Sequence, residues 1–233
     1  MPALQFKQLS DQALFVQFSS TINEQTHQQI QQAIAILQEH PFPGLMEIVP
    51  SYTNFCVYYD PFTVRKSLHQ EHNTTSAEKV QHYIKSLLEH QHQEAPHESR
   101  LMEISVLYGG ENGPDLNEVA DINSLTPEEV IAIHTSQEYL VHMLGFAPGF
   151  PFLGGMDKRI ATPRRAIPRI EIMAGSVGIA GEQTGIYPLS TPGGWQIIGR
   201  TTTPLFLPEQ NPPSLLRAGD RIRFVAIKEG PSC

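Results

Sequence analysis

Three arginines lie close together in the second half of the chain. Arg164 and Arg165 follow Pro163, and Arg169 follows Pro168, so two prolines restrict the segment that carries them. A guanidinium presents a planar fork of N–H donors that matches carboxylate and phosphate oxygens. Because the whole chain has a formal net charge of −8, this local positive charge favours an anionic ligand. A solvated basic loop and a contact with an acidic protein are the alternatives.

Two glycine-containing segments follow the arginines and carry further polar groups. The first has four glycines between positions 175 and 185, and it also contains Gln183 and Tyr187. The second is Gly193-Gly194-Trp195. Glycine in strands lets a ligand approach the backbone, and the amides of a Gly-Gly turn can bind an anion. The alternative for the first segment is a corner of the barrel, and the alternative for the second is a tryptophan packed in the core. Neither segment has the spacing of a Walker A loop or of a dinucleotide-binding fingerprint.

His134 is the candidate general base in this part of the chain. It ends a predicted helix whose start is marked by Thr126, Pro127 and Glu129, a capping box with proline at the first helical position. The negative end of the helix dipole favours a protonated imidazole there, and a structural hydrogen bond is the alternative role. The sequence contains no G-x-S-x-G elbow, no H-E-x-x-H motif and no paired-cysteine site, and therefore no complete catalytic set.

These observations define one candidate site. We expect Arg165 and His134 to act in catalysis. The other members are expected to bind substrate: Arg164, Arg169, Gln183, Tyr187, Gly193 and Gly194. No metal site is predicted, because a polar linker explains His90, His92 and His97 as well as a metal would.

A second unusual segment covers residues 144–155. Phe146, Phe150 and Phe152 alternate there with glycines and prolines, a composition that excludes a regular helix or a long strand. We expect a rigid loop that either presents aromatic rings at a surface or plugs the end of a barrel.

The elements that must position these residues fall into two parts. Gly44 is the only glycine before Gly109, and glycine-poor sequence suits helices and simple strands whereas glycine-rich sequence suits short strands with tight turns. We therefore predict a small α+β domain at residues 1–97 and a mostly β barrel domain at residues 98–233. In the first domain we expect strands near residues 4–9, 13–18, 45–49 and 54–59, with helices after Asn23 and Ser76.

Composition excludes several classes of partner. A mildly acidic chain with 17% charged residues and no basic run is a poor ligand for nucleic acid. No apolar stretch approaches the length of a membrane span, and the first residues lack the pattern of a secretion signal. Two cysteines cannot form a disulfide framework, and they fit a reducing cytoplasm.

The ordered set of motifs resembles the family of 5-oxoprolinase B-type subunits, also described as allophanate hydrolase subunit 1 or as Kip-type histidine-kinase inhibitors. The resemblance covers nearly the whole chain. The residues that carry it are Tyr108-Gly109-Gly110, Gly113-Pro114-Asp115, His134, Glu138-Tyr139, Gly145-Phe146, Pro148-Gly149-Phe150-Pro151, Thr162-Pro163-Arg164-Arg165, Pro168-Arg169, Gln183-Thr184-Gly185, Tyr187-Pro188 and Thr191-Pro192-Gly193-Gly194-Trp195.

The resemblance implies a cyclophilin-like barrel in the second domain and an ATP-dependent reaction that hydrolyses 5-oxoproline to glutamate. It also implies a C-type partner subunit and a third, A-type subunit, so the chain alone is expected to be inactive. The same resemblance leaves two other functions open. One is a regulatory protein that docks on a sensor histidine kinase, and the other is a component of an allophanate-like amide hydrolase.

Overall fold

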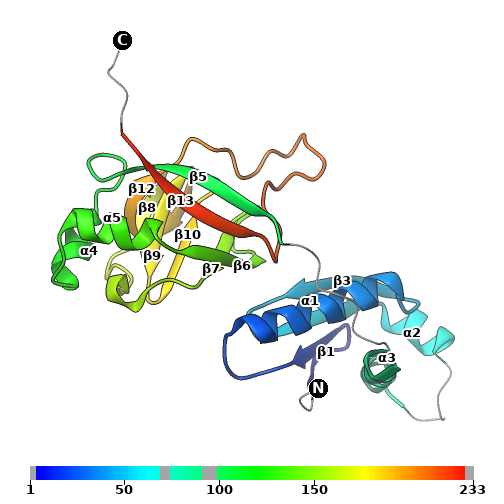
Figure 1. Cartoon of the computed structure of the whole chain (residues 1–233). Helices are drawn as coiled ribbons and strands as arrows, with labels where there is room; N and C mark the ends of the chain where they lie inside the picture. The colour runs from blue at the N-terminus through cyan, green and yellow to red at the C-terminus, as the bar shows by residue number, and fades with distance from the viewer. Residues whose placement is uncertain (1–3, 69–73, 91–98, 229–233) are drawn as a thin grey trace. The chain divides into compact units, whose positions relative to one another are not determined.

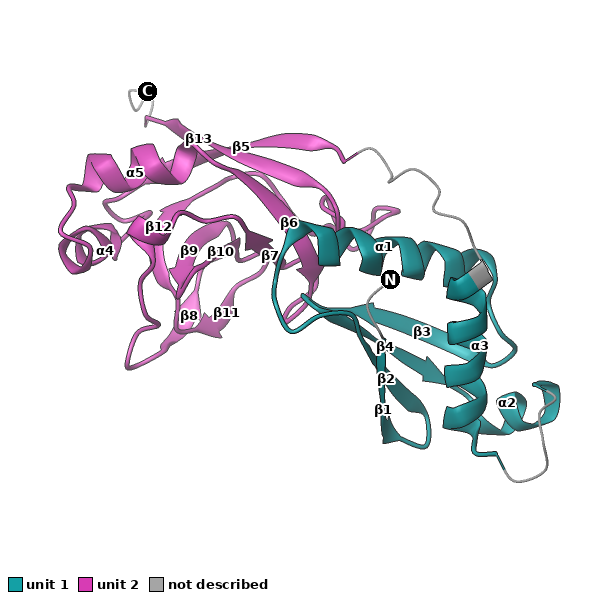
Figure 2. Ribbon diagram, turned by 60° about the horizontal axis from the view of Figure 1, so that its bottom comes forward, with its two compact units in different colours: residues 1–98 teal, residues 99–233 magenta. Residues whose placement is uncertain are grey.

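The computed structural model describes residues 4–68, 74–90 and 99–228. The chain divides into two compact units, Met1–Glu98 and Ser99–Cys233 (Figure 2). His92 and His97, two of the three histidines weighed above as metal ligands, lie outside the described residues.

Unit 1 is built from an antiparallel sheet and helices (Figure 1). The strand order is β1-β2-β4-β3, with bounds β1 Gln5–Ser10, β2 Ala13–Gln17, β3 Leu45–Pro50 and β4 Asn54–Tyr59. The helices are α1 Glu24–Glu39, α2 Pro61–Ser67 and α3 Ser76–His90. The start of α1 is fixed by Asn23, whose side chain accepts the Thr26 N–H at 2.8 Å. Ile30, Ala33 and Leu37 recur at helical spacing and are buried in the core of this unit.

Unit 2 is a closed barrel with the strand order β10-β7-β6-β13-β5-β12-β9. The bounds are β5 Leu101–Tyr108, β6 Glu138–Leu144, β7 Pro151–Gly154, β9 Ser176–Ala180, β10 Gln183–Ile186, β12 Gln196–Arg200 and β13 Arg221–Ile227. Strands β5 and β13 pair in parallel, and the other barrel pairs are antiparallel. With the helices and the sheet of unit 1, the barrel gives the mixed α+β fold that the sequence predicted.

Two helices and one short 3-10 turn accompany the barrel: α4 Leu116–Ile122, α5 Pro127–Thr135 and η1 Lys158–Ile160. The capping box predicted for α5 is confirmed. Thr126 accepts the Glu129 N–H at 3.2 Å, and the Glu129 carboxylate accepts the Thr126 N–H at 2.8 Å.

A separate two-stranded sheet, β8 Arg169–Ile172 with β11 Thr191–Gly193, lies beside β9 and β10 (Figure 2). Apolar side chains fill the barrel, and a second, smaller core of Phe150, Ile172, Tyr187, Trp195 and Ile197 joins this sheet to the barrel wall. None of the helices in the described part of the chain combines the length and the apolar character that a membrane crossing requires.

Candidate functional site

Asp115 organises the arginine segment. This buried residue directly precedes α4, and its carboxylate accepts hydrogen bonds from Arg165 Nη1 at 2.7 Å and from Arg169 Nη1 and Nη2 at 2.7 and 2.6 Å. It also accepts the backbone N–H of Ile197, in β12, at 2.6 Å. Charge-assisted bonds of this kind are about twice as strong as neutral ones. Asp115 therefore fixes two of the three arginines against the barrel.

Glu118 and Gln196 extend this network. Arg165 Nη1 lies 3.4 Å from the Glu118 carboxylate, and Gln196 Nε2 donates to Glu118 at 3.4 Å and to the Pro163 carbonyl at 3.3 Å. Within the described structure, Arg165 Nε and Gln196 Oε1 are buried without a hydrogen-bond partner. Buried polar atoms are rarely left unpaired, so this donor and this acceptor require an explanation.

Sequence analysis missed Asp115, Glu118 and Gln196 as members of the site. Asp115 was visible only as the end of the Gly113-Pro114-Asp115 motif. Its contacts with Arg165 and Arg169 span 50 and 54 residues of sequence, and a single sequence carries no signal for such a pairing.

The arginine segment meets the Gly-Gly-Trp turn. The Arg165 N–H donates to the Gly194 carbonyl at 2.8 Å, and Gly193 pairs with Arg169 between β11 and β8. A Cβ atom at Gly193 would lie only 2.5 Å from the Tyr187 hydroxyl. Glycine is therefore required at position 193 for the chain to pass over this phenol.

Tyr187 is buried beside the arginines. Burial raises the pKa of its phenol to about 12. A hydrogen bond from the backbone N–H of Trp195 and the positive charges of Arg164 and Arg169 lower this pKa, but by less. The phenol is therefore neutral at physiological pH, and its O–H can serve as a hydrogen-bond donor.

Arg164 differs from its two neighbours. It is exposed, and within the described residues it makes no ion pair. Its guanidinium is therefore available to an anionic ligand, whereas those of Arg165 and Arg169 are already bound to Asp115. The predicted site residues that the structure brings together are Arg164, Arg165, Arg169, Tyr187, Gly193 and Gly194, and we call them, with Asp115, the arginine cluster.

Gln183 stands apart from this cluster. It begins β10, opposite Ala180 of β9. It precedes Tyr187 by four positions, an offset that spans roughly 13 Å along an extended strand.

His134 also lies outside the arginine cluster, buried where α5 packs against the barrel strands β5 and β10. Its side chain has no exposed surface, and its ring stacks on Phe224 with 4.4 Å between centroids. Burial lowers the pKa of the imidazole to about 3. The cost of burying a charge therefore exceeds the favourable helix dipole that the sequence predicted for this position.

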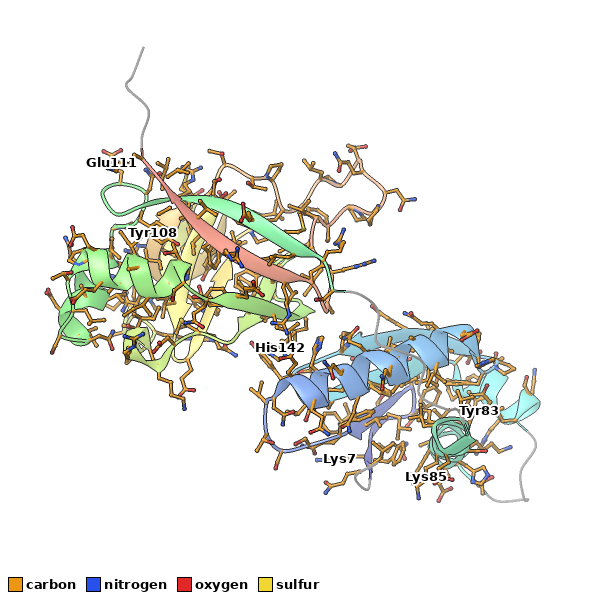
Figure 3. The ribbon with its side chains drawn as sticks, viewed as in Figure 1. Lys7, Tyr83, Lys85, Tyr108, Glu111 and His142 are labelled. Atoms are coloured by element: carbon orange, nitrogen blue, oxygen red, sulfur yellow. The ribbon has the colours of Figure 1, made fainter. Side chains whose placement is uncertain are left out.

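The hydrogen bonds of His134 identify its tautomer. The Thr184 hydroxyl, which has a single proton, donates to the Gly178 carbonyl at 3.0 Å, so it must accept the Nε2–H of His134 at 3.0 Å. Nδ1 then accepts the hydroxyl proton of Tyr108 at 2.8 Å (Tyr108 is labelled in Figure 3, near α5). Both ring nitrogens are satisfied within the barrel wall.

Two hollows on the surface lie away from the arginine cluster. One of about 300 Å³ lies against residues 144–149 and Ser214 in unit 2. Another, of about 320 Å³, lies in unit 1 between Leu68 and residues 79–87 of α3. Neither hollow is lined by an arginine, so the chemistry of the side chains identifies the site better than surface shape does. Among the described residues, no group of His, Cys, Asp or Glu side chains is arranged to hold a metal ion.

Comparison with known proteins gives concordant matches. The family model described as carboxyltransferase domain, subdomain C and D, matches residues 4–216. The B-type subunit of 5-oxoprolinase from Bacillus subtilis (strain 168) is 54% identical over 225 residues, which are 97% of this chain and 93% of that protein. The crystal structure of TTHA0988 has a TM-score of 0.77 and 36% sequence identity; the match covers 95% of this chain but only 40% of the TTHA0988 chain. Kluyveromyces lactis urea carboxylase shares the fold, with a TM-score of 0.77 and 17% identity over 97% of this chain and 22% of its own.

Proposed function

The chain belongs to the family of 5-oxoprolinase B-type subunits, and we propose that it acts with A-type and C-type subunits to hydrolyse 5-oxoproline to glutamate at the expense of ATP. The observation that carries this proposal is the arginine cluster. It offers one unpaired guanidinium, Arg164, beside two guanidinium groups that Asp115 holds rigidly. A small anionic substrate that develops further negative charge during reaction suits such preorganised donors.

We assign separate roles to the three arginines. Arg164 binds the α-carboxylate of 5-oxoproline, because it is the arginine that no carboxylate of the described chain neutralises. Arg165 and Arg169 cannot release Asp115 without leaving a buried charge unpaired. They stabilise negative charge that forms at the reacting carbonyl, with the neutral Tyr187 hydroxyl as a further donor.

The lactam itself matches two unpaired atoms at the site, one on Arg165 in the arginine cluster and one on the neighbouring Gln196. A five-membered lactam is a cis amide, and it therefore presents its C=O acceptor and its N–H donor on one edge. Arg165 Nε is a spare donor and Gln196 Oε1 is a spare acceptor, and both side chains contact Glu118. Both atoms are buried in this structure.

The role of ATP fits a site shared with partner subunits. When bound, ATP would supply the phosphoryl group that activates the lactam oxygen, so that water can attack the carbonyl carbon. The net reaction consumes 5-oxoproline, ATP and two water molecules, and it releases glutamate, ADP and phosphate. This chain has no Walker A loop. We therefore place nucleotide binding outside the arginine cluster and expect the chain alone to be inactive.

His134 and Gln183 receive structural roles in this proposal. His134 joins α5 to β5 and β10 through Tyr108 and Thr184, and a substrate cannot reach it in this structure. Gln183 lies too far along β10 to join Tyr187 at a substrate as small as 5-oxoproline. The proposal also includes a cyclophilin-like barrel, which the resemblance stated above implies, and a cytoplasmic location, which the two cysteines favour.

Docking on a sensor histidine kinase is a second candidate function, and one observation favours it. Phe146 is 67% exposed and has a backbone φ of +67°, a conformation that non-glycine residues rarely adopt. A strained, exposed aromatic ring is a typical interface anchor. Substituting Phe146→Ala tests this second function: if docking is the function, inhibition of the kinase is lost, and unchanged inhibition contradicts it.

The test of the main proposal is a reconstitution assay. Purified chain is incubated with 5-oxoproline alone, with the C-type subunit, and with both partner subunits, each with and without ATP, and glutamate is measured. We expect glutamate only from the complete mixture with ATP. Release by the single chain, or none from the complete mixture, contradicts the proposal. An allophanate-dependent reaction in the same mixture would instead favour the related amide hydrolase.

A further inference from the structure

Lys79 is a buried lysine without a counter-ion in unit 1. It lies on α3 and is only 7% exposed. Its ammonium group donates a hydrogen bond to the Leu68 carbonyl at 2.6 Å, and within the described residues no carboxylate forms an ion pair with it. Lysine is rarely buried to this extent unless an anion pairs with it. The buried charge of Lys79 therefore calls for an explanation.

The bond to Leu68 explains only part of this charge. Leu68 is the C-cap residue of α2, and a lysine beside the end of a helix is favoured by the negative end of its dipole. A carbonyl is nevertheless a dipole, so the ammonium group keeps its full charge and two further N–H donors. Arg65 and Lys66, in the last turn of α2, add positive charge to the same helix end. The surroundings of Lys79 therefore favour an anion.

Lys79 also lines the hollow of about 320 Å³ in unit 1. The other residues that line it are Ser67, Leu68, His82, Tyr83, Ser86 and Leu87. The members on α3 stand at positions 79, 82, 83, 86 and 87, a spacing that places side chains on one face of a helix. The volume lies at the lower end of the range for small-molecule sites, roughly 300–1,000 Å³.

The lining combines hydrogen-bond donors with an apolar surface. His82 is exposed at the hollow and forms no hydrogen bond with another described residue, and an imidazole carries at least one N–H in either charge state. The Tyr83 hydroxyl donates to the His40 carbonyl at 3.0 Å, which holds the Tyr83 ring in place as part of the lining. None of the described residues that line the hollow is acidic, so none repels an anion.

We propose that this hollow binds a phosphate monoester with a small apolar body. Lys79 and His82 donate N–H groups to the phosphate oxygens, and the apolar body lies against Leu68 and Leu87. Phosphate fits better than carboxylate because the cation here is a lysine, a point charge with rotatable donors, whereas the fork of an arginine is the group that matches a planar carboxylate. A phosphate monoester also carries more negative charge at neutral pH than a carboxylate does. The site belongs to unit 1, and it does not depend on the arginine cluster of unit 2.

The test is a calorimetric titration of the full-length chain with phenyl phosphate. Benzoate and inorganic phosphate are titrated separately, because benzoate tests the carboxylate alternative and inorganic phosphate tests the contribution of the apolar body. Lys79→Met removes the ammonium group. Lys85→Met is the matched control, since Lys85 is exposed on the same helix, two positions from Tyr83 and therefore on the other side of α3 (Figure 3). Arg164→Gln tests whether the phosphate binds the arginine cluster instead.

We expect wild type to bind phenyl phosphate with a dissociation constant of about 1 mM or lower and Lys79→Met to weaken this binding about tenfold or more. Lys85→Met and Arg164→Gln should stay within about twofold of wild type, because neither removes a donor of this site. Absence of saturable binding to wild type overturns the inference. Equal binding by Lys79→Met does so as well, as does a loss confined to Arg164→Gln or tighter binding of benzoate than of phenyl phosphate.

Lys79 also caps α2, so thermal unfolding checks that Lys79→Met folds. If it does not, His82→Leu takes its place, because His82 supports no other described residue by a hydrogen bond. This variant should weaken the binding of phenyl phosphate about threefold or more, and unchanged binding by it overturns the inference.

Discussion

Arg169 and Asp115 form a two-point ion pair, with Nη1 2.7 Å from Oδ2 and Nη2 2.6 Å from Oδ1. Arg165 shares Oδ1 of the same carboxylate. One buried aspartate thus accepts both guanidinium groups, and it joins α4, β8 and the segment before β8 to the backbone of β12. This arrangement predicts that Asp115 controls both the stability and the activity of the site.

We expect Asp115→Asn to lower the free energy of unfolding by about 2 kcal/mol. This is less than the cost of breaking a fully buried ion pair, because both arginine side chains are partly exposed. The asparagine amide would direct N–H donors at one of the guanidinium groups. Urea unfolding measures the loss, and Glu171→Gln, an exposed carboxylate in β8, is the control. Unchanged stability of Asp115→Asn would show that the ion pairs contribute little.

Substitutions of the arginines should separate binding from chemistry. Arg164→Lys, which removes the planar fork, should raise KM for 5-oxoproline with little change in kcat, because substrate and transition state share that contact. Arg165→Lys should lower kcat by roughly 30- to 1000-fold, equivalent to about 2–4 kcal/mol. Steady-state kinetics of the reconstituted complex measure both. If Arg165→Lys retains full activity while a folded His134→Ala loses it, His134 is the catalytic residue.

Local signals in the sequence predicted much of the fold and only part of the site. The N-cap at Asn23 and the capping box at Thr126 depend on neighbouring residues, and both helices begin where these signals stand. The helix Pro61–Ser67 was not predicted, although Asp60 caps it. Short helices have too few turns to show a period. The pairing of Asp115 with Arg169 depends on barrel closure, and no local pattern encodes it.

The burial of His134 predicts how stability depends on pH. Its folded-state pKa of about 3 lies below the ordinary value of 6.5, so between these pH values the unfolded chain binds more protons and stability falls as pH falls. From pH 7 to pH 5, wild type should lose about 2 kcal/mol more than His134→Gln. Chemical unfolding at both pH values measures the difference. A His134 that titrates near pH 6.5 in the folded protein would contradict the prediction.

The two units should be separable, because each has its own core. Limited proteolysis is expected to cut between about residues 90 and 100, in the polar sequence that precedes the barrel unit. A fragment from about residue 98 onward should keep a cooperative thermal transition. Circular dichroism and mass spectrometry of the fragments measure this. An unfolded barrel fragment would show that the first unit is needed to complete the second.

The last prediction concerns recognition of the lactam edge by Gln196. If Gln196 Oε1 accepts the lactam N–H, Gln196→Met keeps the volume but removes the acceptor, and KM for 5-oxoproline should rise about tenfold. The lactone analogue has a ring oxygen in place of the N–H, so the variant should lose little or no affinity for it. Inhibition constants of the analogue for wild type and variant measure this contrast. Gln183→Met is the matched control, since Gln183 lies outside the arginine cluster. Equal losses for substrate and analogue would show that Gln196 acts only through the shape of the site.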